Sequence, residues 1–421
     1  MNMRAAGARP DKQDYATLHE QSWAVHGGNR PDVTTGAIRT PIIMANSYRL
    51  PEDPSTLPDD DPDVLVYTRE SGANQLALEA KLAATEHAEA AAVFATGVAA
   101  LHATFFTLLN SGDHAVVSDV VYMRTFGLFD TLLPAKFGIE ATFVDITDLD
   151  AVRAAVRPNT RLVHTELVAN PDLRVADVRA VAGIAHEAGA TLSVDSTFTP
   201  PPLARPLELG ADVVVHSLTK YVNGHGDAMG GAVLGARALI DQVKLDALHH
   251  VGGAISPFNA WLIMRGSVTL QLRLQRHCDN ALAVAEFLAA DPRVTHVAYP
   301  GLANHPQHAA AAAQLSGGFG GVVSFAIAGS HSDRLRFVND LRVITSAVSL
   351  GHDETLVAYE EYPPARAAGF APVFRENGLI RLAVGLEAAA DLVADLDAAL
   401  TTAYGPAGRE GVDPRGGRCR H

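Results

Sequence analysis

Residues 211–231, ADVVVHSLTKYVNGHGDAMGG, decide the fold class of this chain. The run Asp212–Ser217 is almost continuously apolar, as in a strand that is buried on both faces of a parallel sheet. The run ends in two hydroxyl side chains, Ser217 and Thr219, followed by Lys220 and a glycine-rich turn. Hydroxyls and turn amides suit a bound anion, so this stretch predicts a strand that presents an anion site and a lysine.

The same pattern, a short apolar run that ends in polar residues, recurs toward the N-terminus. Helical patterns such as Val175–Ala188 separate several short apolar runs that end in polar residues, which are Ala91–Ala95, His114–Ser118, Ala141–Asp145, Arg161–Glu166 and Thr191–Asp195. Strands that alternate with helices indicate βαβ units. We therefore expect an α/β fold with a mostly parallel sheet.

The length of 421 residues suggests two domains. We predict an extended N-terminal arm over residues 1–64, a large domain over 65–256, a smaller C-terminal α/β domain over 257–402 and a disordered tail over 403–421. The small domain should open with one long helical stretch, Asn259–Leu288, with a candidate kink near Gly266. It should continue with short strands and a final helix, at Val294–Tyr299, Gly321–Ala328, Leu379–Val384 and Glu387–Thr402.

Composition excludes several classes of function. The formal net charge of −14 opposes binding to nucleic acid or to an anionic membrane surface. Two cysteines cannot build a disulfide framework or a cysteine zinc site, and we expect no metal. Because the sequence shows no secretory signal and no apolar run of about 18 residues, we expect a soluble cytoplasmic protein.

Polar residues follow directly after several of the predicted strands. Ligands of open parallel sheets bind outside the carboxyl ends of the strands. The residues expected there are Thr96-Gly97, Tyr122, Glu166, Asp195 and Ser217–Lys220. Each one alone is usually a turn former, a helix cap or a surface residue. Their convergence at one edge favours a shared site.

The chemistry of these side chains fits pyridoxal 5′-phosphate (PLP). Gly97 and Val98 open a helix whose free amides, with Ser217 and Thr219, suit a phosphate. A buried lysine has a lowered pKa and forms a Schiff base with an aldehyde, which is the role predicted for Lys220.

Two further residues complete the predicted cofactor site. Asp195 can pair with a protonated pyridine nitrogen, and that pairing makes the ring an electron sink. Tyr122 can stack on the ring and later handle protons. The predicted catalytic residues are therefore Lys220, Tyr122 and Asp195.

The stretch Ala211–Gly231 resembles the lysine motif of the Cys/Met-metabolism PLP enzymes, the family of cystathionine γ-synthase and methionine γ-lyase. The similarity runs from about Tyr67 to Leu400, and other matching stretches are Gly253–Gly266, His296–His308, Ala347–Gly351 and Leu379–Glu387. The resemblance implies the aspartate-aminotransferase-like fold, called fold type I, with PLP held as a Schiff base on Lys220.

The resemblance also implies roles for residues far from the lysine. Arg381 would bind the substrate carboxylate, and Ser349 and Asn170 would orient substrate and cofactor. Tyr67 and Arg69 match a motif that reaches the phosphate of the neighbouring subunit. A homodimer with shared active sites follows, usually paired into a homotetramer.

Substrate-facing positions depart from the family pattern. Arg124 replaces the active-site cysteine of methionine γ-lyases, and His249-His250 replaces their Lys-Asp pair. Val348 stands where cystathionine-cleaving enzymes tend to carry glutamate, and the stretch Ala358–Pro364 is rewritten. These changes suggest an altered substrate or acceptor, with Arg124 as a candidate contact for an anionic group.

The expected activity is γ-elimination or γ-replacement on a methionine- or homoserine-derived amino acid, through a vinylglycine-type quinonoid. Such an enzyme serves amino-acid metabolism, as transsulfuration enzymes do. One alternative is a specialised biosynthetic enzyme that forms a carbon–carbon bond from that intermediate, with S-adenosylmethionine as a candidate source. Another is a β-lyase or aminotransferase on the same scaffold. Retention of Lys220, Asp195, Tyr122 and Arg381 together opposes a non-catalytic PLP-binding protein.

Overall fold

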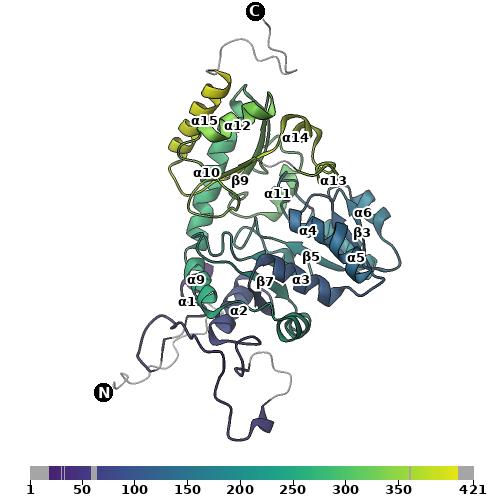
Figure 1. Cartoon of the computed structure of the whole chain (residues 1–421), viewed down its shortest axis with the longest axis vertical. Coiled ribbons are helices and arrows are strands. Elements are labelled where there is room, and N and C mark those ends of the chain that lie inside the picture. Colours follow the sequence, from purple (N-terminus) through teal and green to yellow (C-terminus); the bar gives the residue numbers. More distant parts are fainter. Residues whose placement is uncertain (1–18, 30, 33, 58–63, 360–361, 406–421) are drawn as a thin grey trace, which may run out of the picture.

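The computed structural model describes residues 19–29, 31, 32, 34–57, 64–359 and 362–405. Two sheets organise these residues (Figure 1). The larger sheet contains β1 (Ala90–Phe94), β2 (His114–Ser118), β3 (Glu140–Val144), β4 (Thr160–Glu166), β5 (Thr191–Asp195), β6 (Val213–Ser217) and β7 (Gly231–Gly235). The smaller one contains β8 (Val294–Ala298), β9 (Val322–Ile327), β10 (Thr345–Ser346), β11 (Leu356–Tyr359) and β12 (Ile380–Ala383).

The strand order of the larger sheet is β1-β7-β6-β5-β4-β2-β3. The pairs from β3 to β6 are all parallel, whereas β7 runs antiparallel to both β6 and β1. The central strands are buried along almost their whole length, which explains their continuous apolar sequences. The predicted α/β fold with a mostly parallel sheet is confirmed.

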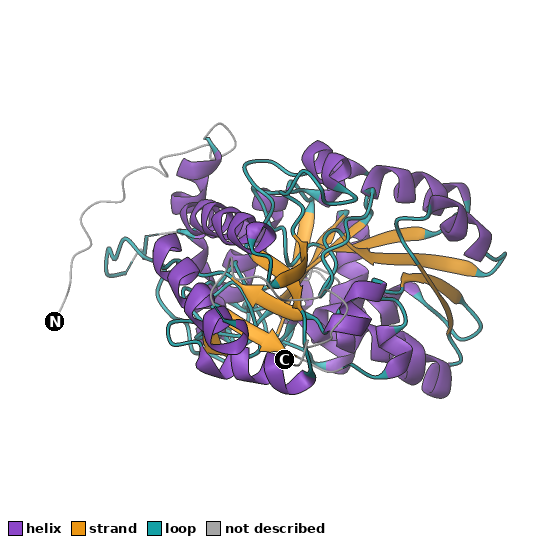
Figure 2. Cartoon of the chain, turned by 90° about the horizontal axis from the view of Figure 1, so that it is seen from above, coloured by secondary structure: helices purple, strands orange, loops and turns teal. Residues whose placement is uncertain are grey.

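Helices cover both faces of this sheet (Figure 2). One apolar core contains side chains of α3 (Gly97–Leu108), η3 (Leu128–Leu132) and α8 (Arg237–Val243). The core on the opposite face contains side chains of α2 (Ala73–Glu86), α6 (Leu149–Ala155) and α7 (Val178–Glu187). The shorter helical segments of this region are α4 (Met123–Gly127), α5 (Leu133–Phe137), η4 (Pro206–Leu209) and η5 (Lys244–Val251).

The C-terminal part is built on the smaller sheet, in the order β10-β11-β12-β9-β8, where only the β10–β11 pair is parallel. The helix α10 (Leu270–Ala290) packs on this sheet and follows α9 (Pro257–Ser267) directly. The remaining helices are α11 (His308–Gln314), α12 (His331–Asp340), α13 (Pro364–Ala367), α14 (Pro372–Asn377) and α15 (Ala389–Tyr404).

Three local details differ from the expectations. The stretch 259–288 is two helices that break at Val268-Thr269, next to the candidate kink at Gly266. Gly266 packs closely on the backbone of Asn223, since a Cβ at Gly266 would lie 2.1 Å from the carbonyl oxygen of Asn223. The antiparallel strand β7 was not predicted, since its sequence GAVLG merges with the preceding turn. Thirdly, α15 continues to Tyr404 and so enters the stretch that was predicted to be a tail.

The N-terminal arm carries two short helical segments, α1 (Glu20–His26) and η2 (Pro54–Thr56), and is otherwise without regular structure where it is described. Residues 1–18 of the predicted arm and residues 406–421 of the predicted tail lie outside the described residues. The domain boundaries at residues 64, 256 and 402 stay predictions. None of the described helices is both long enough and apolar enough to cross a bilayer.

Candidate active site

A cavity of about 700 Å³ lies at the carboxyl ends of β4, β5 and β6, and the C-terminal part closes its other side. It gathers most of the side chains that the sequence predicted for the site, namely Gly97, Val98, Tyr122, Arg124, Asn170, Asp195, Ser217, Thr219, Lys220, Ser349 and Arg381. These residues come from strand ends and loops more than 280 positions apart (residues 97–381). The parallel sheet is what brings them together.

The anion end of the cavity is a close-packed cradle. The helix α3 begins at Gly97, and the side chain of Thr96 caps it by accepting from the amide of Ala99 at 3.0 Å. A Cβ at Gly97 would lie 2.7 Å from the Cβ of Ser217, so only glycine fits there. Free helix amides beside the Ser217 hydroxyl therefore form a pocket that fits a phosphate.

Lys220 is the reactive amine of the cavity. Its Nζ donates to the Oγ of Ser349 at 2.7 Å. Burial and, secondarily, the nearby charge of Arg381 lower the pKa of Lys220 to about 8. The backbone of Ser349 has a φ of +102°, a conformation that residues with a side chain rarely adopt. A pKa of about 8 makes the neutral amine much more populated near physiological pH than in an ordinary lysine, and the neutral form can attack an aldehyde.

Asp195 provides the buried negative charge. It is 9% exposed, and its Oδ1 accepts from the amide of Thr197 at 2.9 Å. Burial raises the pKa of Asp195. A protonated pyridine nitrogen at this carboxylate would offset the cost of burying it, so the residue fits the pyridine end of the cofactor.

Arg381 and its neighbours form the carboxylate-binding corner. The guanidinium of Arg381 donates to the Oδ1 of Asn170 at 2.9 Å and to the carbonyl oxygen of Ser349 at 3.2 Å. Within the described residues its Nε has no hydrogen-bond partner. A substrate carboxylate would fill that position, since arginine binds carboxylates through paired donors.

Glu166 is a site residue whose role the sequence analysis did not assign. Its carboxylate accepts from the backbone amides of Tyr122 and, at 2.6 Å, of Asn170. Burial, with the nearby charge of Asp195, raises the pKa of Glu166 to about 8. The signal was available: Glu166 ends β4, opposite Asp195 in the register of β5.

The wall opposite the sheet is aromatic and cationic. Arg366 donates to the carbonyl oxygen of Asn170 at 3.0 Å, and its guanidinium lies over the rings of Phe126, Tyr362 and Phe370. Arg366, Tyr362 and the 70% exposed Val348 all line the cavity. Sequence reasoning did not single out Arg366, because nothing in its local sequence indicates what it packs against.

Tyr67 and Arg69 do not line this cavity. Arg69 lies over the Tyr67 ring at 5.6 Å from its centroid, and its guanidinium donates to the backbone carbonyl of His249. The geometry therefore does not support a role for Tyr67 and Arg69 in this chain's own site. No cluster of metal-ligating side chains occurs within the described ranges.

The cavity combines a reactive amine, an anion cradle and a buried carboxylate. This combination is typical of an amino-acid enzyme built around a pyridoxal-type cofactor. Comparison with known proteins gives the family. The profile of the Cys/Met metabolism PLP-dependent enzymes matches residues 21–401, and the chain belongs to that family. It is accordingly a PLP-dependent enzyme of the lyase or transferase type.

Individual relatives narrow the chemistry. The chain is 55% identical to canavanine gamma-lyase of Pseudomonas canavaninivorans, over 94% of this chain and 100% of the relative. It is 40% identical to L-methionine gamma-lyase of Pseudomonas putida, over 90% and 96%. The crystal structure of cystathionine gamma synthase from Xanthomonas oryzae pv. oryzae, in complex with aminoacrylate and cysteine, matches with a TM-score of 0.85 at 36% identity, over 92% and 98%. The shared activity is γ-elimination or γ-replacement.

Proposed function

We propose that this enzyme breaks the bond between Cγ and its heteroatom in a homoserine-derived amino acid, with L-canavanine as the first candidate. The supporting observation is the 55% identity to a canavanine gamma-lyase over nearly the whole chain, against 40% to a methionine gamma-lyase. Canavanine is homoserine with a guanidino group on its oxygen, so it falls within the substrate class that the sequence predicted.

Different residues of the cavity act on the α-carboxylate and on the α-proton of the substrate. Arg381 holds the α-carboxylate, with Asn170 fixing the guanidinium through its Oδ1. Lys220, whose lowered pKa of about 8 makes its neutral form accessible, takes the α-proton on Nζ. The Oγ of Ser349 accepts from that Nζ and holds it in place. PLP, when bound, supplies the electron sink for the α-carbon, and Asp195 supports it.

The opposite wall faces the leaving group. With canavanine the Cγ–O bond breaks and its electron pair stays on oxygen, which takes a proton to give hydroxyguanidine. Val348 places no charge at this wall, and the planar face of Tyr362 suits a planar guanidino group. The four-carbon remainder gains water, either at the imine carbon, to yield 2-oxobutanoate and ammonia, or at Cγ, to yield homoserine.

We also propose that a second copy of the chain completes each site. Tyr67 is 42% exposed and lies away from this chain's own cavity together with Arg69. A tyrosine hydroxyl and a guanidinium on an outer surface suit the phosphate of a neighbouring site. The supporting stretch is the Tyr67–Arg69 motif, and the assembly would be a dimer or a pair of dimers.

A substrate panel tests the activity. Purified holoenzyme is mixed separately with L-canavanine, L-methionine, O-acetyl-L-homoserine, L-cystathionine and S-adenosylmethionine. Hydroxyguanidine, 2-oxobutanoate and homoserine are then quantified. We expect canavanine to give the highest kcat/KM, with one hydroxyguanidine released per substrate consumed. A higher kcat/KM for methionine or cystathionine would overturn the canavanine assignment, and pyruvate or pyridoxamine phosphate would indicate a β-lyase or aminotransferase.

A further inference from the structure

The turn after Lys220 (residues 221–224) accepts hydrogen bonds from a side chain of α10. Arg273 lies in the first turn of this helix and is 6% exposed. Its guanidinium donates to the carbonyl oxygen of Tyr221 at 2.7 Å and to that of Val222 at 3.4 Å. Because these two residues follow Lys220 directly, the guanidinium fixes the peptides next to the reactive amine.

The same guanidinium also contacts the break between α9 and α10. It donates to the carbonyl oxygen of Gly266 at 2.9 Å and to the hydroxyl of Thr269 at 3.1 Å. Gly224 of the turn has a φ of +68°, and a Cβ there would lie 1.7 Å from the Nη1 of Arg273. The turn and the guanidinium are therefore packed with no room for a side chain between them.

The need for a packed side chain does not by itself explain an arginine here. The acceptors of Arg273 among the described residues are three carbonyl oxygens and one hydroxyl, with no carboxylate among them. Burial lowers the pKa of this guanidinium to about 10, against the opposing charge of Asp353. An apolar side chain would avoid the cost of burying a cation, but it could not hold several carbonyls at once.

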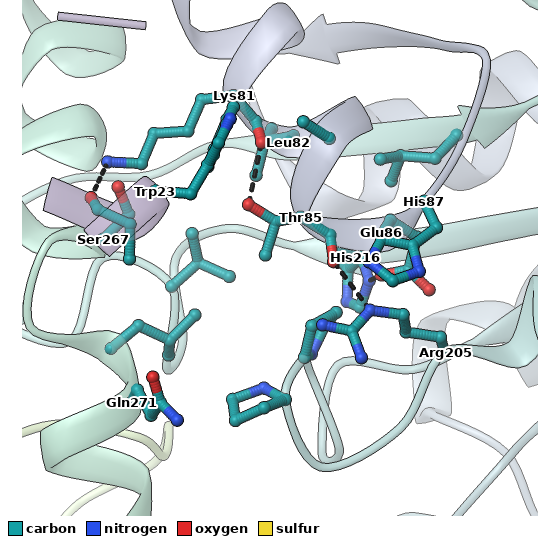
Figure 3. A pocket seen from close by; sticks show the side chains of 17 residues that line it. Trp23, Lys81, Leu82, Thr85, Glu86, His87, Arg205, His216, Ser267 and Gln271 are labelled. Carbon is teal, nitrogen blue, oxygen red and sulfur yellow. Dashed lines mark hydrogen bonds and ion pairs between the residues drawn. The ribbon is translucent and has the colours of Figure 1, made fainter. Parts of the chain in front are cut away.

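Side-chain packing leaves this stretch of chain partly open. Lys220 lines the active-site cavity, and Val222 lines a second cavity of about 240 Å³. Figure 3 shows the second cavity, with Ser267 and Gln271 on one side and His216 on the other. Hydrogen bonds to the backbone therefore restrain peptides that have open space beside them.

The chemistry of the site requires such a restraint, because the reacting groups come from two parts of the fold. Lys220 follows the end of β6, whereas Ser349 and Arg381 belong to the C-terminal part. The α-proton and the α-carboxylate of a substrate are attached to one carbon. A displacement of Lys220 relative to Arg381 would therefore slow proton transfer.

We propose that Arg273 is a positioning residue that holds the amine of Lys220 in register with Arg381. It does so by fixing the carbonyls of Tyr221 and Val222. Arg273 does not line the active-site cavity, so it acts through the turn. The inference rests on the proposed role of Lys220 as the base for the α-proton, and not on the choice of canavanine as the substrate.

Exchange of the α-proton measures this step by itself. Holoenzyme is incubated in D₂O with L-norvaline, which has no leaving group, and the loss of the α-proton signal is followed by NMR at several norvaline concentrations. Arg273→Lys keeps a cation but loses the fork that reaches several carbonyls. We expect its maximal exchange rate to fall about tenfold or more, while the half-saturating norvaline concentration changes less than about threefold, because Arg381 is untouched.

Arg276→Lys is the matched control. Arg276 lies one turn further along α10, is exposed, and also donates to two successive carbonyls, those of Leu386 and Glu387. This variant should keep its maximal exchange rate within about twofold of normal. An equal fall in both variants would overturn the inference, as would a half-saturating concentration that rises as much as the rate falls.

A pair of glycine variants tests the same contact with Arg273 in place, and decides the matter if Arg273→Lys does not fold. Gly224 and Gly226 both have a φ of +68°, so alanine is strained in the same way at either position. At Gly226 the added Cβ lies 3.3 Å from the ring of His352 and does not meet the guanidinium. We expect Gly224→Ala to slow exchange about tenfold or more and Gly226→Ala less than about threefold. Equal rates in the two would contradict the proposal.

The experiment separates this inference from the role of Lys220. Absence of exchange in the unaltered enzyme would overturn the role of Lys220 as the base, and this inference with it. A normal exchange rate in Arg273→Lys, with a lower midpoint of thermal unfolding, would leave Lys220 as the base and show that Arg273 supports only the fold.

Discussion

The two sides of the active-site cavity are built differently. The sheet side is made by helix and strand ends, where Gly97, Asp195 and Ser217 sit in a packed framework. The opposite side is made by loops of the C-terminal part, where Val348 is 70% exposed and the ring of Tyr362 packs on that of Phe370. We therefore expect changes on the sheet side to disturb cofactor binding and changes on the loop side to alter substrate preference.

The largest expected effect comes from removing the amine on the sheet side. Lys220→Ala deletes both the cofactor attachment point and the base for the α-proton, so kcat should fall by about 10³-fold or more. The matched control is Lys136→Ala on the exposed end of α5, which should keep full activity. Steady-state kinetics on canavanine check both, and a Lys220→Ala enzyme with more than a tenth of normal activity would contradict the role.

The second largest effect is expected from adding a methyl group to the phosphate cradle. Gly97→Ala places a Cβ 2.7 Å from the Cβ of Ser217, a contact that neither residue can relieve by rotating a side chain. We expect about 10- to 100-fold weaker PLP binding, from the cost of overpacking. Gly127→Ala is the control, since nothing lies within 4 Å of its added Cβ. Equilibrium dialysis measures PLP affinity, and equal values for the two variants would refute the cradle.

Glu166 tests whether the sheet side also positions the substrate corner. Glu166→Gln replaces one acceptor oxygen with a donor that faces an amide, either of Tyr122 or of Asn170. We expect a roughly tenfold lower kcat/KM, from the loss of about one buried hydrogen bond. The pH profile should also change near pH 8, because the titration of Glu166, with its pKa raised to about 8, is lost while that of Lys220 remains. Glu187→Gln, on an exposed helix face, is the control; an unchanged pH profile in Glu166→Gln would count against the prediction.

The pH dependence of cofactor binding links the two sides. Only neutral Lys220 attacks the PLP aldehyde, and its pKa is lowered to about 8, so reconstitution of apoenzyme should accelerate as pH rises through about 8. Arg381→Met removes the positive charge that helps to lower this pKa, so the midpoint should move to higher pH. Stopped-flow absorbance at several pH values measures it. A midpoint that moves to lower pH would show that Arg381 does not act through charge.

The smallest effect is expected on the loop side. Tyr362→Leu removes a planar face from the leaving-group wall, so kcat/KM for canavanine should fall about two- to tenfold, while that for methionine changes less. Competition between the two substrates in one reaction measures the ratio directly. An equal loss for both substrates would mean that Tyr362 supports the fold of the wall and does not select the leaving group.

Sequence reasoning reached the sheet side well. The strands His114–Ser118 and Thr191–Asp195 were predicted with their observed bounds, because parallel strands buried on both faces carry a strong apolar signal. Lys220 and Asp195 follow directly from where such strands end. The candidate kink near Gly266 lies beside the break between α9 and α10, but the close packing of Gly266 on Asn223, a residue more than 40 positions away, could not be predicted.

The loop side was much less accessible to prediction. Arg366 and Tyr362 have no periodic neighbours, and their place in the cavity depends on how the C-terminal part packs on the sheet. The buried partner of His216 on β6 could not be predicted either, because Glu86 lies 130 residues earlier in the chain. The departure at Val348 was visible in the sequence, but its position in the cavity required the fold.

The backbone of Ser349 has a consequence for the evolution of the protein. A φ of +102° at a residue with a side chain disfavours the folded state by about 1–3 kcal/mol. Ser349→Gly would relax this torsion and raise the thermal stability of the apoprotein, yet it would remove the hydroxyl that contacts Lys220. Selection for heat resistance alone would therefore favour glycine at position 349, whereas the contact with Lys220 requires serine.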